Sequence, residues 1–591
     1  MNKKELYNKI LQLDGLTNEE KSELLGLLRK QKKYGLVWED KPEDVEERLR
    51  DELPVLIEDA TKAIISDYTD APNHVLIEGD NLEALAALTY THEGKIDVIY
   101  IDPPYNTGNK DFVYNDSFVD SEDTYRHSKW LSFMNKRLRI AKQLLSDKGV
   151  IFISIDDNEQ AQLKLLCDEI FSQNNFVSDV IWQHSIQPKG YAGKFSLHHN
   201  YTLIYRKSEK FILRNMERTE EDNKAYKNPD NDPRGKWRSG DVRNALYRPN
   251  LIYDIITPSG KIIHAPEKGW RWSKETVAEK INSGEIVFNR DETNIIRKIY
   301  LDTVEGRCPE TIWFGKDVGT TREANTELKE VFDGEVPFDT PKPTGLLKRI
   351  MTIGADNNST ILDFFAGSGT TLHATMQLND EDGGHRKCIL VTNNENNICE
   401  EVTYERNKRV INGYTTPKGE EVPGLKGNTL RYYRTSFVGR SRSMKNMRQL
   451  MTLSTDMLCI KEDLYAEQPK FGEQQTYKNV FRYFDNGKKR MMIIYKEEAV
   501  PLLVDLIQKT DYEGMMRVYV FSPSEDPWEG EFEEVQDKVQ LCALPQAIYN
   551  AYRRILPKKK DDLIASDDTE TTHQEDILNG MLNFDEEEEL Q

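Results

Sequence analysis

A rigid loop rich in hydrogen-bond acceptors is predicted directly after an apolar run. The run, residues 96–101, is rich in β-branched side chains and predicts a buried strand. Asp102, Pro103, Pro104 and Tyr105 follow it, and the two prolines remove two backbone donors and restrict φ. A carboxylate and carbonyl oxygens held this way could bind a polar substrate against the tyrosine ring. The alternative is a plain strand-terminating turn in which Asp102 bonds its own backbone.

A second motif lies about 260 residues further along the chain. Residues 361–371 predict a strand that runs into a glycine turn at a helix start. Gly367 and Gly369 would let the backbone approach a ligand closely, and helix-start N–H groups favour anionic or polar ligand atoms. The motif is neither a phosphate P-loop nor the three-glycine dinucleotide fingerprint. Alone it could be an ordinary helix start, but together with the first loop it indicates a ligand site.

Strands alternate with helices around both motifs. This alternation falls at 74–171 and resumes at 356–413, so we predict an α/β fold with a parallel sheet and crossover helices. The segment between the two blocks is rich in Gly, Pro, Asn, Arg and Trp and breaks the pattern. The sheet is therefore expected to be assembled from two stretches of sequence with an insertion between them.

A chain of 591 residues is too long for one core, so several domains are expected. We predict an N-terminal helical or dimerisation segment (1–65), the first half of the sheet domain (66–182), a loop-rich insertion (183–330), the second half of the sheet domain (331–435), a smaller C-terminal α/β domain (436–560) and an acidic, disordered tail (561–591).

The distribution of charge allows a nucleic-acid partner although the net charge is −21. Residues 561–591 hold twelve Asp and Glu and no Lys or Arg, whereas residues 183–300 hold 22 Lys and Arg against 15 Asp and Glu. An acidic chain with one basic segment fits a protein that touches phosphates in one place. The alternative is ordinary variation along a long chain.

No feature of the sequence indicates a membrane or a metal. No apolar run approaches the length of a bilayer span, and the first residues lack a signal-peptide core. The six cysteines show no metal-ligand spacing. We therefore expect reduced thiols, no bound metal, no membrane partner and a cytoplasmic location.

The two motifs, "DPPY" and "DFFAGSGTT", resemble those of amino-directed DNA methyltransferases. Their order, with the catalytic motif first and the cofactor motif second, is that of the beta class. "GDNLEAL", "NPDNDPRGKWRSGD" and "FDTPKP" are similar to the modification (Mod) subunits of Type III restriction–modification systems. The resemblance covers roughly residues 70–435. It implies a Rossmann-like S-adenosylmethionine-dependent methyltransferase fold with permuted motifs, and a target-recognition domain in the insertion.

The resemblance implies methyl transfer from S-adenosylmethionine to the N6 amine of an adenine flipped out of duplex DNA. The Asp102 carboxylate and the Pro103 carbonyl would accept the amine's N–H groups and free its lone pair. Pro104 would help to keep the loop rigid, and Tyr105 would stack on the extruded base. Phe112 and Tyr114 could contact the base, or they could pack in the hydrophobic core.

The same resemblance places the cofactor along the glycine turn. The implied cofactor-binding residues are Asp80, Asn81, Lys342, Pro343, Asp363, Phe365, Ala366, Gly367, Ser368, Gly369, Thr370 and Glu395. Asp80 matches the acid that binds the cofactor adenine, and Lys342 and Pro343 match the segment near the methionine end. Thr392 stands where a ribose-binding acid is expected, and Glu395 could replace it from a shifted position.

The resemblance implies three partners: double-stranded DNA, a second copy of the chain and a restriction (Res) subunit. Because the sequence shows no Walker-type lysine loop, any DNA cleavage would have to be done by the Res subunit. The predicted DNA contacts are Lys189, Arg234, Lys236, Trp237, Arg238 and Arg243. One alternative is N4-cytosine methylation, for which a serine in place of Asp102 is commoner. Another is a sequence-specificity module for a partner nuclease, against which the intact motifs argue.

Overall fold

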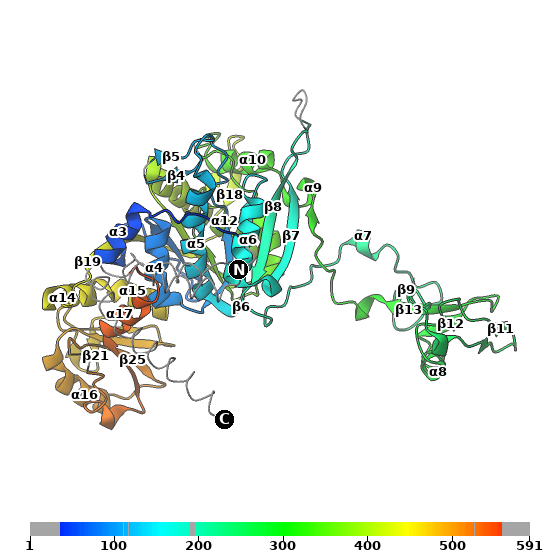
Figure 1. The fold of residues 1–591 in the computed structure, drawn as a ribbon. Coiled ribbons are helices and arrows are strands. Elements are labelled where there is room, and N and C mark those ends of the chain that lie inside the picture. The colour runs from blue at the N-terminus through cyan, green and yellow to red at the C-terminus, as the bar shows by residue number, and fades with distance from the viewer. Residues whose placement is uncertain (1–35, 110, 116, 189–194, 525, 558–591) are drawn as a thin grey trace, which may run out of the picture. The chain divides into compact units, whose positions relative to one another are not determined.

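The computed structural model describes residues 36–557, apart from 110, 116, 189–194 and 525. Its contacts divide the chain into two compact units (Figure 1). The larger unit is formed by the residues up to Ile212 together with those from Thr311 onward, and the smaller unit is Leu213–Glu310. Within the described part of the chain, no helix has the length and apolar character needed to cross a bilayer.

A ten-stranded sheet runs through the larger unit (Figure 1). In spatial order its strands are β1 (Glu52–Glu58), β19 (Thr429–Gly439), β2 (Asn73–Glu78), β16 (Lys387–Thr392), β15 (Thr360–Asp363), β3 (Ile96–Ile101), β6 (Leu145–Ile155), β8 (His199–Arg206), β7 (Phe176–Gln183) and β14 (Ile312–Trp313). The six strands from β19 to β6 are parallel, whereas β1 and β8 pair antiparallel with their neighbours. The predicted α/β fold with a mostly parallel sheet is confirmed.

The winding of the chain reverses between β3 and β15, which are adjacent strands. The connections through α4 (Asn81–His92) and α5 (Arg126–Leu144) lead from β2 to β3 and from β3 to β6. The connection through α12 (Thr370–Asp382) leads the other way, from β15 to β16. Because such crossovers are right-handed, α4 and α5 cover one face and α12 the other. Ligands of open α/β sheets bind at the carboxyl ends of the strands at this point of reversal.

The core of the larger unit explains why these segments form strands and helices. Ile99, Ile101 and Ile151 are fully buried in the sheet, and they belong to the apolar runs that predicted strands. Leu85 of α4 and Leu138 of α5 are equally buried against them. On one side α4, α5 and α6 (Gln160–Phe171) pack together, and on the other α11 (Thr344–Gly354), α12 and α13 (Glu405–Asn412) do so.

Strands of this sheet, β1 and β8 among them, lie where the sequence predicted other structure. Residues 1–65 were expected to be helical, yet after the helix α3 (Asp44–Asp51) the chain forms β1, whose apolar run "LPVLI" is buried against β19. Residues 1–35 of that segment lie outside the described residues. Similarly, β8 falls inside the expected insertion 183–330 but pairs with β6 in the main sheet. The compact unit Leu213–Glu310 lies within that expected insertion.

The smaller unit, Leu213–Glu310, has its own core. Its largest sheet is antiparallel, in the order β12 (Ile286–Phe288), β13 (Ile295–Tyr300) and β9 (Trp237–Gly240). The short helix α7 (Glu220–Asn223), the helix α8 (Lys274–Asn282) and the strand pair β10 (Ile255–Ile256) and β11 (Ile262–Ile263) complete it. Trp270 is buried at the centre with Val277 and Ile286. The loops of the unit are thus arranged around an apolar core of its own.

The C-terminal residues form a second α/β layer within the larger unit. The helices α14 (Met444–Leu453) and α15 (Thr455–Glu462) lead into a five-stranded sheet in the order β20 (Glu467–Gln468), β23 (Phe481–Asp485), β24 (Arg490–Ile494), β25 (Met516–Phe521) and β26 (Val539–Leu544). Met491 and Ile493 face the main core, whereas Met492 and Ile494 face α16 (Val500–Lys509). The helix α17 (Gln546–Arg553) packs on α4. The acidic tail lies outside the described residues.

Candidate active site

The two sequence motifs meet at the point of reversal in the sheet. The loop from Asp102 to Tyr105 begins where β3 ends, and the glycine turn begins where β15 ends. These strands are neighbours in parallel register, with Ile99 opposite Leu362. The carboxyl ends of parallel strands lie at the same edge of a sheet. Both motifs therefore lie at the carboxyl edge, close enough to form one site.

Three hydrogen bonds hold the Asp102–Tyr105 loop in place. The Trp130 indole Nε1 donates to the Pro104 carbonyl over 2.7 Å, and Trp130 itself is fully buried in α5. The Tyr105 hydroxyl donates to Asp102 Oδ1 over 2.9 Å. Lys342 Nζ donates to the other carboxylate oxygen, Oδ2. Both carboxylate oxygens of Asp102 therefore have a donor within the chain. These hydrogen bonds restrict the loop in addition to its two prolines.

Lys342 lies beside the catalytic loop. Its Nζ lies on Asp102 and 5.4 Å from the centre of the Tyr105 ring, and the contact with the methionine end of the cofactor implied for it stays a prediction. The Lys342 side chain is only 10% exposed. Lys342 and Asp102 form an ion pair that is partly shielded from water, where opposite charges attract more strongly than at a fully exposed site.

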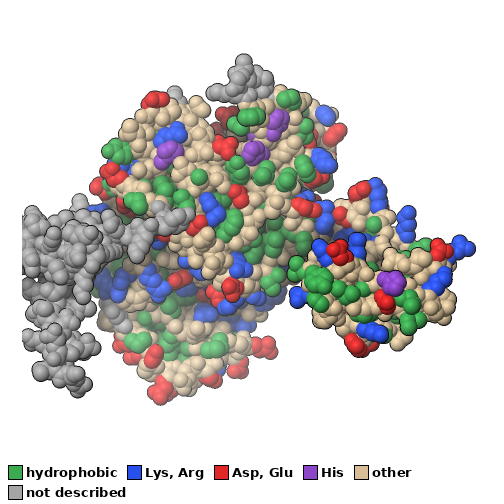
Figure 2. Space-filling model, turned by 45° about the vertical axis from the view of Figure 1, so that its right-hand side comes forward, with side chains coloured by type: hydrophobic (Ala, Val, Ile, Leu, Met, Phe, Trp, Pro, Cys, Tyr) green, Lys and Arg blue, Asp and Glu red, His purple; other side chains and the backbone are tan. Residues whose placement is uncertain are grey.

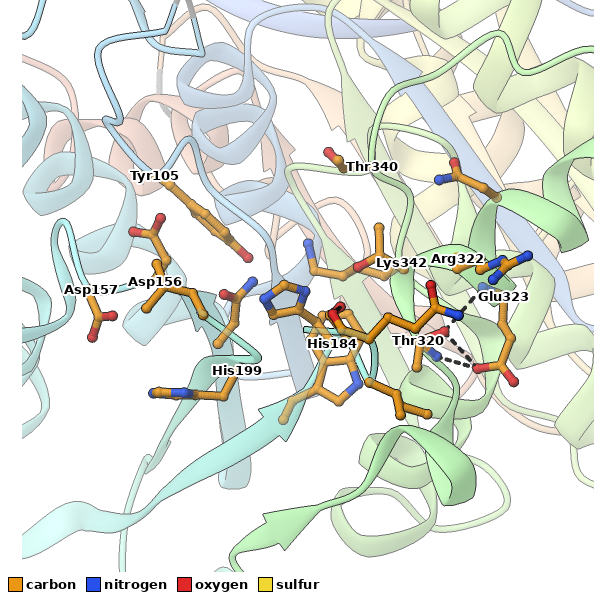
Figure 3. Close-up of a pocket in the computed structure, with 18 of the residues that line it drawn as sticks. Tyr105, Asp156, Asp157, His184, His199, Thr320, Arg322, Glu323, Thr340 and Lys342 are labelled. Carbon is orange, nitrogen blue, oxygen red and sulfur yellow. Dashed lines mark hydrogen bonds between the residues drawn. The ribbon is translucent and has the colours of Figure 1, made fainter. Parts of the chain in front are cut away.

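A cavity of about 1410 Å³ opens beside this loop (Figure 3). Tyr105 and Lys342 point into it from the motif side, and His184 and His199 from the opposite side (Figure 3). Trp182 and Asp156 also line it. Volumes of this order exceed what a small ligand needs, and the ring of Tyr105 gives a face for a planar group. The cavity can admit a base with parts of its neighbouring nucleotides.

A second, smaller pocket of about 320 Å³ lies on the other side of the loop. It is lined by Asp80, Asn81, Pro104, Phe365, Thr392 and Glu395, among other residues. Consecutive residues of the catalytic loop thus face different pockets, Pro104 the smaller and Tyr105 the larger. Both Thr392 and Glu395 border the smaller pocket, so the ribose contact predicted for Glu395 stays a prediction.

The glycine turn is built from residues that face inward and residues that face the pocket. Gly367 and Gly369 have φ of 47° and 72°, in the left-handed region that favours glycine. Asp363 is buried and accepts from Thr371 Oγ1 over 2.5 Å and from the Phe365 amide over 3.0 Å. Burial raises the pKa of Asp363 to about 7. Its carboxyl therefore stabilises the turn through these two hydrogen bonds from the buried side.

Several other predicted cofactor residues also face the protein. The Ser368 hydroxyl lies 3.0 Å from that of Thr370, and the fully buried Arg406 donates to Thr370 Oγ1 over 2.6 Å. Ala366 is buried, and Pro343 is the residue before α11. Of the predicted set, Asp80, Asn81, Phe365 and Glu395 line the smaller pocket.

Asp80 has a structural role in addition to any role in ligand binding. Its Oδ1 accepts from the amide of Leu82 over 2.7 Å, so it caps the N-terminus of α4. Its Oδ2 lies 3.6 Å from the guanidinium of Arg137. This carboxyl is 40% exposed toward the pocket, so it keeps acceptor capacity for a ligand.

Arg137 and Glu43 are among the residues of the smaller pocket that the sequence analysis missed. Arg137 donates from Nη1 to both carboxylate oxygens of Glu43 over 2.9 Å and from Nε to Asn81 Oδ1. Its guanidinium lies 3.6 Å from the centre of the Phe133 ring. Burial raises the pKa of Glu43. Glu43 lies outside every motif, although the capping box that it forms with Glu46 at the start of α3 is visible in the sequence.

Phe112 and Tyr114 prove to be packing residues. Phe112 is 1% exposed, with its ring edge against Phe133 at a centroid distance of 5.2 Å. The Tyr114 ring is buried, and its hydroxyl donates to the Lys41 carbonyl over 2.7 Å. Phe112 thus has no surface left for a base, whereas Tyr114 still borders the smaller pocket.

Most of the predicted DNA contacts are already engaged within the smaller unit. Arg234 donates to Asp232 from Nε and Nη2, to the Ser283 carbonyl from Nη1 and to the Gly284 carbonyl from Nη2. Arg243 binds Asp241, Trp237 Nε1 donates to Asp230, and Arg238 donates to the Tyr226 hydroxyl. Lys189 lies outside the described residues. Among the described residues, the side chain of Lys236 has no such polar partner.

The cationic side chains of this unit are dispersed. Figure 2 shows Lys and Arg side chains scattered over its visible face, with Asp and Glu between them. Lys298 is buried and binds Asp232 over 2.6 Å, in the same network as Arg234. Several basic residues of the unit therefore take part in its own ion pairs, and the DNA contacts predicted for it stay a prediction.

Comparisons with known proteins agree with this site. Residues 96–412 match a family model described as DNA methylase. The Mod subunit of the Type III restriction–modification enzyme StyLTI of Salmonella typhimurium is 36% identical over 57% of this chain and 55% of that protein. The Type II methyltransferase M.KpnI of Klebsiella pneumoniae is 35% identical over 58% of this chain and 87% of that protein.

A third relative, the Type III EcoPI Mod subunit of Escherichia phage P1, is 32% identical over 58% of this chain and 60% of that protein. The chain thus aligns with little more than half the length of the Mod subunits that it matches. The family match at residues 96–412 includes both motifs.

Proposed function

This chain belongs to the DNA methylase family, and on that premise we propose that it is an S-adenosylmethionine-dependent adenine-N6 DNA methyltransferase. One observation carries the proposal. The Asp102–Tyr105 loop separates two pockets, with Pro104 in the smaller and Tyr105 in the larger. A methyl donor in the smaller pocket and a base in the larger would meet across this loop, as group transfer requires.

The smaller pocket fits the cofactor chemically. Phe365 offers an apolar face, and Asp80, Asn81 and Glu395 offer polar atoms for an adenosine moiety. The turn with Gly367 and Gly369 lets backbone N–H groups approach a ligand closely. Bound there, S-adenosylmethionine supplies an electrophilic methyl group on its sulfonium. The chain's own part is to orient the acceptor amine toward it.

Asp102 and Pro103 are the groups that prepare the amine. Adenine N6 is a poor nucleophile because its lone pair is delocalised into the ring. Acceptance of its two N–H groups by a carboxylate oxygen and a backbone carbonyl would favour a tetrahedral nitrogen and free that lone pair. Asp102 Oδ2 already accepts a hydrogen bond from Lys342 Nζ. The amine must therefore share this carboxylate with Lys342 or displace the lysine. Each carboxylate oxygen has two lone pairs, which permits sharing.

The larger cavity suits a base that has left the duplex. The target amine is out of reach inside a helix, and extrusion costs a few kcal/mol. Tyr105 would stack on the extruded base, and the duplex would lie against the smaller unit, which supplies the target recognition. Asp102 favours adenine over cytosine, because the cytosine-N4 enzymes more often carry serine there.

We further propose that the chain is the Mod subunit of a Type III restriction–modification system. The support is the similarity to the StyLTI and EcoPI Mod subunits. In this role the chain would act in the cytoplasm as a homodimer and would bind a Res subunit. Light scattering with and without DNA tests the dimer, and a fully active 68.6 kDa monomer at high dilution would refute it.

The activity is tested directly with purified chain, labelled S-adenosylmethionine and duplex DNA. Mass spectrometry of the digested DNA should show N6-methyladenine, and Asp102→Ala should lose transfer about 100-fold or more while it keeps cofactor binding. N4-methylcytosine, or methyl groups only in RNA, would contradict the assignment. Transfer without any added Res chain is expected, whereas cleavage is not.

A further inference from the structure

The carboxyl group of Glu159 lies buried behind the catalytic loop. Glu159 precedes α6, and its side chain has no exposed surface. Its Oε1 accepts from Asn106 Nδ2 over 2.5 Å and lies 2.6 Å from His127 Nδ1. Asn106 is the residue directly after Tyr105. One carboxyl oxygen therefore links the end of the catalytic loop to the starts of α5 and α6.

Asn106 is the residue through which such a link would act on the loop. It is fully buried and has a φ of 59°, a conformation that asparagine tolerates better than most residues. Its amide nitrogen also lies 3.3 Å from the Arg126 carbonyl, to which it donates. With the Trp130 bond to Pro104, these contacts hold the loop from its middle and from its end. Asn106 thus gives a change at Glu159 a direct route to Tyr105.

The surroundings of Glu159 favour its neutral form. Its Oε2 and Asn106 Oδ1 are buried with no hydrogen-bond partner among the described residues. Burial raises the pKa of Glu159 to about 8, while the Asn106 bond and Arg126 lower it and Asp156 raises it. Burial and Arg126 lower the pKa of His127. At neutral pH the groups that meet here are thus a carboxylic acid, an imidazole and an amide.

We propose that Glu159 is a positioning residue whose buried carboxyl holds Asn106, and with it the Asp102–Tyr105 loop, in the arrangement that receives the target base. This role rests on the proposed methyltransferase function. It differs from that of Asp102, because Glu159 lines neither pocket and touches no reacting atom.

The proposal has a direction in pH. The pKa of Glu159 in the folded chain is above its usual value, so the neutral carboxyl present at low pH becomes a carboxylate as the pH rises through about 8. The Asn106 donor still binds the carboxylate, so the effect of ionisation comes from a buried charge and not from loss of this hydrogen bond. Ionisation would place a charge with one undonated oxygen beside Asp156. Arg126 and His127 from α5 are the other titratable groups that face it, and neither gains charge as the pH rises.

The experiment compares Glu159→Gln and Glu159→Ala with the wild-type chain. Glutamine keeps the oxygen that accepts from Asn106 and cannot ionise, whereas alanine removes the link. For each protein, kcat, KM for duplex DNA and the cofactor Kd are measured from about pH 6 to about pH 10. Fluorescence of a duplex with 2-aminopurine at the target position reports base extrusion without turnover.

We expect the wild-type kcat to fall about tenfold per pH unit above pH 8. Glu159→Gln should keep about half or more of the neutral kcat and lose this fall. Glu159→Ala should lower kcat about tenfold or more and reduce the 2-aminopurine signal, with the cofactor Kd unchanged. The matched control is Asp179→Asn, since Asp179 is a half-buried carboxyl that binds Gln160 of α6 and not the loop. It should keep the wild-type pH profile.

Two results would overturn this role while the methyltransferase function stands. One is an active wild-type enzyme whose alkaline fall is the same in Glu159→Gln. The other is a Glu159→Ala variant with normal kcat. If Glu159→Ala does not fold, the comparison of Glu159→Gln with the wild-type chain decides alone. A wild-type chain that binds cofactor but transfers no methyl group to DNA would refute the proposed function and this role with it.

Discussion

The glycine turn allows a prediction in which one helix supplies both the test and its control. Gly369 and Gly383 are the residues that flank α12, and both have left-handed φ, of 72° and 67°. Alanine at either position costs about 1 kcal/mol for this conformation. They differ in their surroundings. A Cβ at Gly369 would lie 2.5 Å from Asn407 Nδ2 and 3.1 Å from the Thr403 carbonyl, whereas a Cβ at Gly383 would meet nothing within 4 Å.

Asn407 cannot easily give way to a new methyl group. It is fully buried, and its Nδ2 donates to the Thr403 carbonyl over 2.8 Å and to the Gly369 carbonyl over 3.3 Å. Displacing it would lose these bonds, at about 1 kcal/mol each. Gly369→Ala should therefore lower the free energy of unfolding by about 2–4 kcal/mol, and Gly383→Ala by about 1 kcal/mol.

Chemical unfolding and calorimetric titration with S-adenosylmethionine measure the two consequences. Gly369→Ala should also raise the cofactor Kd at least about tenfold, because the turn that borders the smaller pocket must shift. Gly383→Ala should leave the cofactor Kd unchanged. Equal loss of stability in the two variants would show that the contact with Asn407 is not limiting. Unaltered cofactor affinity in Gly369→Ala would show that the turn is not part of the cofactor site.

Three further predictions concern the rest of the site. Lys342→Met should lower kcat about 10–100-fold with little change in the cofactor Kd, since the lysine acts on Asp102; a raised Kd with normal kcat would place it at the methionine end instead. Arg234→Ala should destabilise the smaller unit by about 1–3 kcal/mol, seen as a lower melting temperature, and leave the methylated sequence unchanged, because this arginine binds Asp232; a relaxed sequence preference in methylome sequencing would make it a base reader. Exchange of residues 213–310 for the same region of a relative should change the methylated sequence and keep N6-adenine chemistry; an unchanged motif would place recognition outside this unit.

Local sequence was sufficient for the parts of the site that depend on chain-local rules. A β-branched run followed by two prolines ends a strand in a rigid loop, and a strand followed by two glycines begins a helix with open N–H groups. Both motifs were found this way, and so was the α/β alternation that implied one sheet from two blocks. The spacing of apolar residues does not show which strand another strand pairs with, however, and β1 and β8 were missed for this reason. Their apolar residues are explained by β19 and β6, which are far away in the sequence.

What the tertiary structure decided is which polar groups are already engaged. The types of Arg234, Arg243 and Lys342 suggested ligands, but Asp232, Asp241 and Asp102 bind them within the chain. Glu159 carried no signal in the sequence, because its importance comes from burial next to Asn106, 53 positions earlier. Composition and spacing show which groups a chain possesses. Only the fold determines which of them are desolvated, which are paired, and which remain free to bind a ligand.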